Sequence, residues 1–487
     1  MSAVSASGSA HSAASAAPPH SRSSVSAREL ALLTMPQLGL MLCHMGMSMT
    51  DVTITGLISP AAQASLGVVG QVFTLLMLVA SLVGSGCLAA VSQALGMGLA
   101  RRAARYAALI VVLALFVGVV VAVSALLGLP LMLRLMNITE QMRPVVGCFV
   151  TAYCFQLPFY YALIMINSVF RAYKLVALPF FAMLAVALVN LAGSALFGLG
   201  LFGFPDFGYA GVAWASFAAG LLGFFWNMGA AVRRGVLRRE HMPTMRWARK
   251  AAPYLFRVGG PAALGNIAGH SGNLVIYSLL SGLPGDSVFL LAGLALGMTA
   301  ESVLLFPVAA LGMSMAILGG HLLGGRQASR LRKLGGGTAL VTFCVAAGCA
   351  VVLFGLRRDV AALLAPRPET AAALTFFLGY SCLSLPVRCA GMILHGVFSG
   401  TGATRLSCMV SCLCMWALYV PLAFLLARGL EWGAAGVFCA MTLSHCASFA
   451  WTVRLFKGKK WLEYGMRRRQ NEYSPISPDP GGKRGGC

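Results

Sequence analysis

Four polar side chains share one face of a predominantly apolar stretch, residues 30–57, and one of them is a carboxylate. His44, Ser48, Asp51 and Thr55 follow one another at steps of four, three and four, the spacing that puts side chains on one side of a helix. A carboxylate facing lipid is costly, so we expect Asp51 to face the protein interior and to have a function there. The alternative is a polar stripe that only hydrogen-bonds to neighbouring helices.

A second polar stripe lies in residues 253–280. Asn266, His270, Asn273 and Tyr277 repeat the same spacing on one helical face. His270 has a side chain that can change its charge near neutral pH, which would let it respond to a proton gradient. A neutral imidazole that hydrogen-bonds between two helices is an equally good interpretation.

Two further charged residues fall inside apolar stretches. Glu301 lies six residues before Pro307, and both a functional and a packing role fit it. Arg388 cannot lose its charge, so it needs a carboxylate or carbonyl partner elsewhere in the fold. With the second stripe, these two residues are candidates for a substrate cavity or for a site in the second half of the chain.

The composition indicates a polytopic membrane protein. Of 487 residues, 59% are hydrophobic and only 10% are charged, whereas soluble proteins are usually about 45–50% apolar and about 25% charged. The net charge of +23 does not predict a nucleic-acid partner, because the basic residues lie in short connections and tails. The cysteines lack paired metal-binding spacing, and no nucleophile–base pair or acidic pair suggests an enzyme.

Apolar runs bounded by Gly, Pro and charges predict an all-α membrane fold with twelve spans. Each run meets or exceeds the ~20 residues that cross a bilayer as a helix. The spans are expected at residues 30–57, 65–96, 104–128, 144–168, 175–200, 209–231, 253–280, 287–319, 336–356, 372–398, 404–427 and 433–455.

The connections divide the chain and orient it. Lys and Arg are concentrated in the connections that follow even-numbered spans and in the long middle connection, 232–252. By the positive-inside rule, that side and both termini are cytoplasmic. We expect a first lobe at 30–231, a second lobe at 253–456, a disordered tail at 1–29 and a basic tail at 457–487.

An internal repeat relates the two halves. Leu157-Pro158 matches Leu385-Pro386, and Gly96 matches Gly324, in each case 228 residues apart. Two copies of six spans keep the same orientation, because six is even. The lobes should therefore be related by a pseudo-two-fold axis along the membrane normal, with a cavity between them.

The chain resembles the multidrug and toxic compound extrusion (MATE) family of transporters. The resemblance is carried by Pro36, Asp51 and Gly56 in the first span, and by the turn Ser92-Gln93-Ala94-Leu95-Gly96 after the second. It extends to AESVLLFPVAALGMSMA from Ala300, and to GVFSGTGATR after the tenth span. It covers about residues 30–456.

The resemblance implies a V-shaped pair of six-helix lobes and alternating access driven by a proton or sodium gradient. One branch of the family has an ion-coupling site whose members, carried over by position, are Asp51, Asn190, Ser194 and Ser216. Ser194 stands where a carboxylate is usual. One carboxylate is a poorer match for Na⁺, so we expect H⁺ as the coupling ion, with Na⁺ the alternative and no other cofactor. The proposed movement bends the first helix at Pro36.

The resemblance also implies export of chemically varied, often cationic small molecules. A flippase for a lipid-linked precursor is the alternative on the same architecture, and Arg388 is then the candidate for holding its phosphate. The family suggests a bacterial inner (cytoplasmic) membrane and a monomer embedded in lipid. A receptor or scaffold without transport is the simplest remaining alternative.

Overall fold

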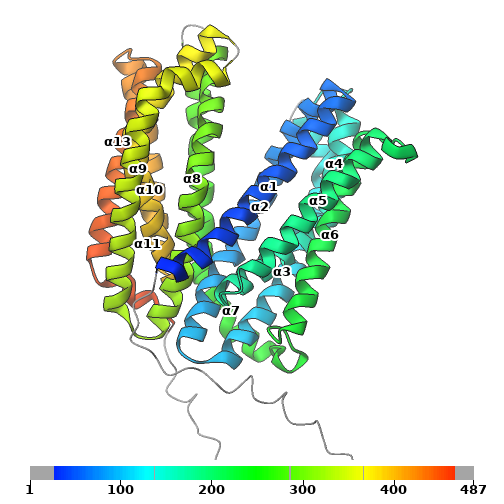
Figure 1. Ribbon diagram of the computed structural model, residues 1–487, viewed down its shortest axis with the longest axis vertical. Helices are drawn as coiled ribbons and strands as arrows, with labels where there is room; N and C mark the ends of the chain where they lie inside the picture. The colour runs from blue at the N-terminus through cyan, green and yellow to red at the C-terminus, as the bar shows by residue number, and fades with distance from the viewer. Residues whose placement is uncertain (1–26, 136–137, 284–286, 366, 467–487) are drawn as a thin grey trace, which may run out of the picture.

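The computed structural model describes residues 27–135, 138–283, 287–365 and 367–466. The predicted tails therefore fall largely outside the described residues, at 1–26 and 467–487. Long helices form two bundles that meet at one end and separate at the other, which gives the chain a V shape (Figure 1). The predicted all-α, two-lobed fold is confirmed.

Six helices build the N-lobe. They are α1 (Ala27–Ile58), α2 (Pro60–Gly96), α3 (Ala100–Leu135), α4 (Arg143–Ala172), α5 (Ala177–Leu199) and α6 (Tyr209–Arg233), with a 3₁₀ turn η1 (Leu201–Gly203) between the last two. Each is bounded where the sequence offers a turn. Ser59, for example, caps α2 by accepting a hydrogen bond from the backbone of Ala62 at 3.0 Å.

The C-lobe repeats this plan. Its helices are α7 (Met245–Ser281), α8 (Ser287–Gly324), α9 (Ala328–Leu364), α10 (Pro368–Thr401) and α13 (Ala434–Lys457). The eleventh span is a single rod made of α11 (Thr404–Leu413), a π-helical segment η3 (Cys414–Tyr419), α12 (Val420–Phe424) and a second π-helical segment η4 (Leu425–Gly429). Short 3₁₀ turns, η2 (Arg239–His241) and η5 (Lys460–Tyr464), lie in the connection between the lobes and after α13.

Within the described residues, eleven helical segments are long and apolar enough to cross a membrane. The exception among the twelve predicted spans is α7, which is long but carries the polar stripe of Asn266 and Asn273. It packs between α2 of the N-lobe and α11 of its own lobe. Asn266 and Asn273 line cavities, which accounts for part of the polar surface of α7.

The backbone confirms the repeat seen in the sequence. Residues with left-handed φ occur at Gly98 and Arg326, and again at Lys174 and Gly402, and both pairs are 228 residues apart. Gly208 and Gly433 precede α6 and α13 with nearly the same dihedrals, φ 55° ψ −137° and φ 57° ψ −133°. Side chains other than that of glycine rarely adopt this conformation. The matching turns show that the two halves share a local geometry as well as a sequence pattern.

The lobes join where α2 crosses α8. Gly96 lies against the backbone of His321, and Gly324 lies against Gln93 and Gly96, so close that an added Cβ would overlap the facing backbone. Gln93 fixes the same crossing. Its amide donates to the Gly400 carbonyl at 3.0 Å, and its carbonyl oxygen accepts from the Tyr254 hydroxyl at 3.1 Å.

The segment after α13 reinforces this junction. Trp461 is fully buried, its ring stacks on Phe456, and its indole nitrogen donates to the Phe456 carbonyl at 2.9 Å. The backbone nitrogen of Met466 then donates to Gln93 at 2.7 Å. The predicted tail at 457–487 thus begins with a folded segment that packs against the joined end. At the other boundary, α1 already begins at Ala27, inside the predicted tail 1–29.

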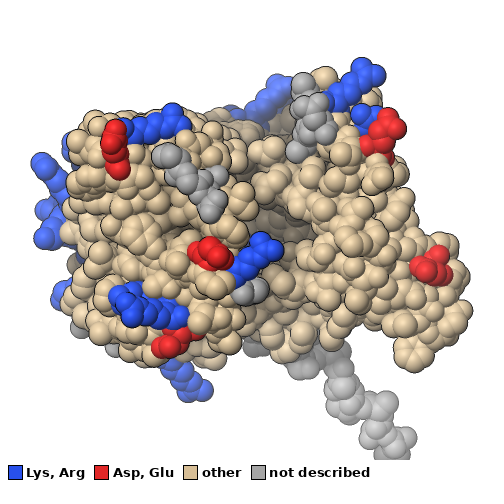
Figure 2. Space-filling model, turned by 90° about the horizontal axis from the view of Figure 1, so that it is seen from above, with Lys and Arg blue, Asp and Glu red and all other residues tan. Residues whose placement is uncertain are grey.

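Seen from the open end of the V, the surface is hollowed between the two lobes (Figure 2). Few charged side chains lie on this face, and most of its area is uncharged. Both observations agree with a cleft that widens toward one side of a bilayer.

Candidate functional site

Asp51 lies inside the N-lobe, where its carboxylate meets side chains from two other helices. Its carboxylate accepts hydrogen bonds from the Asn190 amide at 3.3 Å and from the Ser216 hydroxyl at 3.2 Å. The Asn190 amide also donates to the Ser216 oxygen at 2.8 Å. Three helices, α1, α5 and α6, therefore meet at one carboxyl group in the predicted membrane interior.

Several buried oxygens beside this carboxylate lack a partner. Ser194 and Thr55 are fully buried, and their hydroxyl oxygens make no hydrogen bond with any described residue. The carbonyl oxygen of the Asn190 side chain is unpartnered as well. Buried polar atoms are normally satisfied, so this cluster has spare capacity to accept from a proton donor or to bind a cation.

Local packing explains how the helices reach this arrangement. Gly39 has no side chain, which lets the Phe180 ring lie against α1 and brings α5 close to it. On the other side, the Gln156 amide of α4 donates to the backbone carbonyl of Ser216 at 3.3 Å. The carboxyl of Asp51 is thus held by a frame of helix contacts and by side-chain hydrogen bonds.

The other members of the first polar stripe do not join this network. His44 is half-buried and Ser48 is exposed, and no described residue hydrogen-bonds to either side chain. Pro36 lies within α1 with helix on both sides of it. On each side of Pro36, a side chain reaches the C-lobe. The Thr34 hydroxyl and the Gln37 amide both contact the hydroxyl of Ser314 at 2.9 Å.

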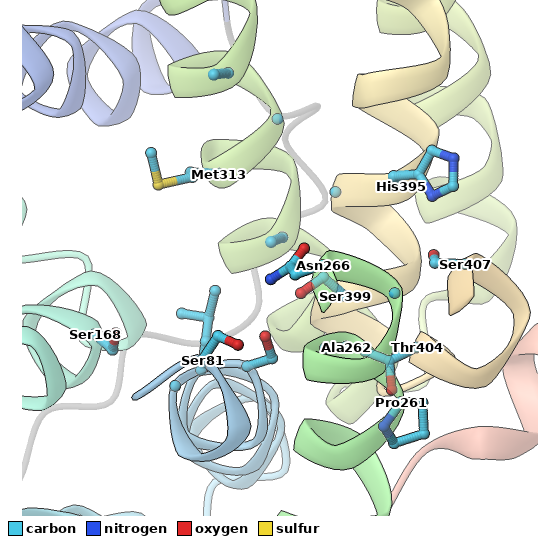
Figure 3. Close-up of a pocket in the computed structure, with 18 of the residues that line it drawn as sticks. Ser81, Ser168, Pro261, Ala262, Asn266, Met313, His395, Ser399, Thr404 and Ser407 are labelled. Atoms are coloured by element: carbon cyan, nitrogen blue, oxygen red, sulfur yellow. The ribbon is translucent and has the colours of Figure 1, made fainter. Parts of the chain in front are cut away.

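A large cavity of about 750 Å³ lies between the lobes. Residues of α2 and α4 line its N-lobe side, and residues of α7, α8, α10 and α11 line its C-lobe side (Figure 3). Ser81 and Asn266 face each other across it. None of the described residues that line this cavity is an Asp or a Glu.

Arg171 is the cavity's permanent positive charge. Its guanidinium donates to the Ser168 hydroxyl at 2.6 Å and to the Met313 sulfur at 3.0 Å, and its Nε is buried with no acceptor. No described carboxylate pairs with it, and Glu29, near the same end of the helices, pairs with Lys174 at 2.7 Å. In sequence, Arg171 follows the predicted span 144–168 like an ordinary connection residue, so its place in the cavity was not predicted.

A smaller cavity of about 140 Å³ lies within the C-lobe and contains an ion pair. Glu301 of α8 accepts hydrogen bonds from Arg388 of α10 and from the Ser381 hydroxyl, the latter at 2.6 Å. Glu301 is thus the partner that Arg388 was expected to need. His445 of α13 also lines this cavity, and its Nδ1 is unpartnered.

The second polar stripe divides between the two cavities. Asn266 lines the central cavity, whereas Asn273 and Tyr277 line the C-lobe cavity, where the Tyr277 hydroxyl contacts the Met298 sulfur at 2.9 Å. His270 lies between them on an exposed part of α7 and lines neither cavity. The spacing of the stripe correctly predicted that its residues share one face of a helix. This helix is 37 residues long, however, and its face borders the central cavity at one point and the C-lobe cavity at another.

A protein-family model matches this chain in two stretches, residues 36–196 and 261–425, and the model is that of the MatE family. The chain belongs to the MatE family. This membership confirms the resemblance drawn from the sequence and identifies the chain as a MATE transporter rather than an enzyme. Each matched stretch lies within one lobe.

Known proteins agree with this assignment. The chain is 22% identical over 424 residues to a curated protein of Bacillus subtilis (strain 168), the uncharacterized transporter YisQ, covering 87% of this MATE transporter and 92% of YisQ. The bent form of the Vibrio cholerae MATE transporter VcmN superposes with a TM-score of 0.81 at 20% identity, covering 90% of this chain and 98% of VcmN. A transporter of the MOP superfamily from Pyrococcus furiosus, described as having a binding pocket of reverse polarity, gives 0.79 at 17% identity, with coverage of 89% and 96%. At these identities the structural likenesses establish the fold.

Proposed function

We propose that this MATE transporter exports small molecules by alternating access, in exchange for an ion that binds at Asp51. The observation that carries the proposal is the Asp51 carboxylate inside the helix bundle, held by Asn190 and Ser216, with unpartnered buried oxygens on the same helices. A titratable group inside a membrane helix bundle is energetically unfavourable, so its presence there indicates a function. We favour H⁺ as the ion, because the cluster has one carboxylate and Ser194 adds no charge.

Protonation would reverse a hydrogen bond in this cluster. The ionised carboxylate only accepts, from the Asn190 amide and the Ser216 hydroxyl. A protonated Asp51 becomes a donor, and the unpartnered Asn190 carbonyl oxygen is the acceptor that a rotation of the amide would present to it. One proton thus changes the bonds between α1 and α5, and the helices gain two alternative arrangements.

Helix α1 connects this change to the other lobe. Asp51 lies fifteen positions after Pro36, about 22 Å along the helix at 1.5 Å per residue. Pro36 lacks a backbone N–H, so the helix is easier to bend there. At that point Thr34 and Gln37 contact Ser314 of α8, which adjoins Met313 of the central cavity. A bend of α1 would therefore move a wall of the cavity.

The side of the membrane to which the cleft opens follows from the charge pattern. Basic residues flank the joined end of the V, with Arg101, Arg171, Lys174, Arg326 and Arg405 near its turns. The positive-inside rule makes this end cytoplasmic, together with both termini. The described conformation then faces outward, and we propose that the chain functions in the cytoplasmic (inner) membrane, as a monomer.

The deciding experiment uses purified protein in proteoliposomes loaded with a fluorescent dye. A pH gradient and a Na⁺ gradient are imposed separately on wild type and Asp51→Asn, which keeps the side-chain size but cannot titrate. We expect wild-type dye movement to follow the pH gradient and to vanish in Asp51→Asn. The matched control is Asp206→Asn, an exposed acid in the loop before α6, which should behave as wild type.

Two outcomes would redirect the proposal. Movement driven by Na⁺ alone would make Na⁺ the ion, with the oxygens of Asp51, Ser194 and Thr55 as ligands of the type that hard cations prefer. Unchanged transport by Asp51→Asn across pH 6–8 would refute the coupling role of this residue.

The flippase alternative loses its main support in the structure. Arg388 was its candidate phosphate ligand, but Arg388 lies in the C-lobe cavity and is paired with Glu301. A guanidinium already neutralised by a buried carboxylate is a poor ligand for a pyrophosphate. We therefore retain export of soluble small molecules as the proposed function.

A further inference from the structure

The charge of the central cavity bears on what it can carry. The family resemblance implies substrates that are often cationic, and a cation is normally bound by a carboxylate or by aromatic faces. The described lining residues include no carboxylate, and their permanent charge is the Arg171 guanidinium. This inference rests on the proposed function, since it takes the cavity between the lobes as the substrate site.

The hydrogen bonds of Arg171 leave room for a stronger partner. One of its acceptors is the thioether sulfur of Met313, a weak acceptor, and its Nε has none. A guanidinium in a partly buried site is stabilised most by a planar oxyanion, which accepts two parallel hydrogen bonds. The structure supplies no such anion from its own described residues, so the position is open to one from outside.

The other charged and titratable groups of the cavity do not offset Arg171. The His395 ring points away from Asn266 (Figure 3), and its Nε2 lies 3.5 Å from the Thr452 hydroxyl of α13. The remaining polar side chains of the wall are mostly neutral hydroxyls, among them those of Ser81, Ser399 and Thr404, together with the Asn266 amide.

The apolar wall fits the rest of such a molecule. Met77, Tyr160, Met313 and Met392 line the same cavity, and flexible Met side chains with an aromatic ring accommodate flat apolar bodies of varied shape. A volume of about 750 Å³ lies within the range of sites for drug-sized ligands. Charge and shape together describe an amphipathic anion.

We propose that the central cavity binds organic oxyanions, with the guanidinium of Arg171 on the carboxylate, phenolate or phosphate group and the Met-rich wall on the apolar body. The proposed substrates are therefore anions, whereas the family resemblance implies organic cations.

Two xanthene dyes test this assignment, because they share a skeleton and differ in charge. Wild-type protein in phosphatidylcholine nanodiscs is titrated at pH 8 against fluorescein, an anion, and rhodamine 123, a cation, and binding is followed by fluorescence anisotropy. We expect fluorescein to bind more tightly. Arg171→Gln should weaken fluorescein binding by roughly 10- to 100-fold, the loss of a charge-assisted hydrogen-bonding group, and leave rhodamine 123 binding unchanged or improved.

Two further variants separate a binding role from a structural one. Arg171→Lys keeps the positive charge and should retain most of the preference for fluorescein, although it loses the two-pronged contact. Arg101→Gln removes an exposed arginine from the same end of the molecule and should change neither affinity. If Arg171→Gln weakens both dyes equally, if wild type prefers rhodamine 123, or if it binds neither dye, the proposal is overturned.

A last arm identifies the source of the oxyanion. Farnesyl pyrophosphate, a short lipid pyrophosphate, is added as a competitor against bound fluorescein. Displacement only at concentrations above those needed for unlabelled fluorescein supports a soluble organic anion. Much tighter displacement would overturn that choice in favour of a lipid headgroup. Fluorescein binding without gradient-driven movement in proteoliposomes would refute the exporter while leaving the anion site standing.

Discussion

The buried ion pair between Glu301 and Arg388 in the C-lobe makes a quantitative prediction, because removing either partner leaves the other charge in a buried site without its counter-charge. The side chains are 8% and 23% exposed. Removing one partner of a buried pair usually costs about 3–5 kcal/mol, and the partial exposure of Arg388 places the expected loss near the lower end, about 3 kcal/mol.

The two single substitutions should each be destabilising, and the double substitution should not. Glu301→Gln leaves the Arg388 guanidinium without its counter-charge, and Arg388→Met leaves the Glu301 carboxylate without one, so each should lose about 3 kcal/mol. The double variant Glu301→Gln/Arg388→Met removes both charges and should lie within about 1 kcal/mol of wild type, because no unpaired charge remains.

The measurement is unfolding in mixtures of mild detergent and SDS at neutral pH, followed by tryptophan fluorescence. Losses that simply add in the double variant would show that the two groups do not stabilise each other.

Three further predictions concern the coupling cluster and the joined end. Ser194→Asp adds a second carboxylate to the Asp51 cluster and should make transport respond to a Na⁺ gradient in the proteoliposome assay. If transport by this variant responds to a pH gradient alone, the two side chains do not bind an ion together. Gln93→Leu removes a side chain that holds α2, α7 and α10 together, and should loosen the joined end by about 1–3 kcal/mol. The loosening is measured as faster labelling of Cys408, which lines the central cavity, by a thiol reagent and peptide mass spectrometry. Gly96→Ala places a methyl group against the α8 backbone and should separate the lobes, which would be measured as a lower melting temperature. Gly67→Ala, on the same helix, is the control: no atom lies within 4 Å of the added carbon, so the melting temperature should not change.

Local sequence patterns predicted the helices well, because a span needs only a long apolar run bounded by turns. The predicted span 30–57 became Ala27–Ile58, and 433–455 became Ala434–Lys457. The internal repeat could also be predicted from the sequence, because corresponding turns lie 228 residues apart in the two halves. The ends of the spans were predicted less accurately. Helix α9 extends to Leu364, beyond the predicted 356, because charged residues continue its helix outside the apolar run.

Contacts between distant helices were harder to predict. The sequence indicated that Arg388 needs a partner, yet nothing local points to Glu301, which lies on another helix. Arg171 shows the opposite failure. Basic residues at helix ends obey the positive-inside rule whether they face water or a cavity, and only the packing of α4 against the cleft distinguishes the two cases. The cluster at Asp51 came from the family resemblance, and its hydrogen bonds now give that prediction a geometry, while its role in ion coupling stays a prediction.

The contact between Gly96 and Gly324 has a consequence for how such a chain can be assembled. Gly96 and Gly324 hold corresponding positions in the two halves, so each glycine contacts its own counterpart. Two equivalent residues can contact each other only next to the axis that relates the halves. A half-length protein pairing with a second copy of itself would make the same contact, glycine to identical glycine. The covalent connection at 234–244 is then not needed to specify how the halves dock. Residues 1–238 and 239–487, expressed together as separate polypeptides, should find each other through this crossing, whereas either alone would leave a stripe of bare backbone exposed to lipid.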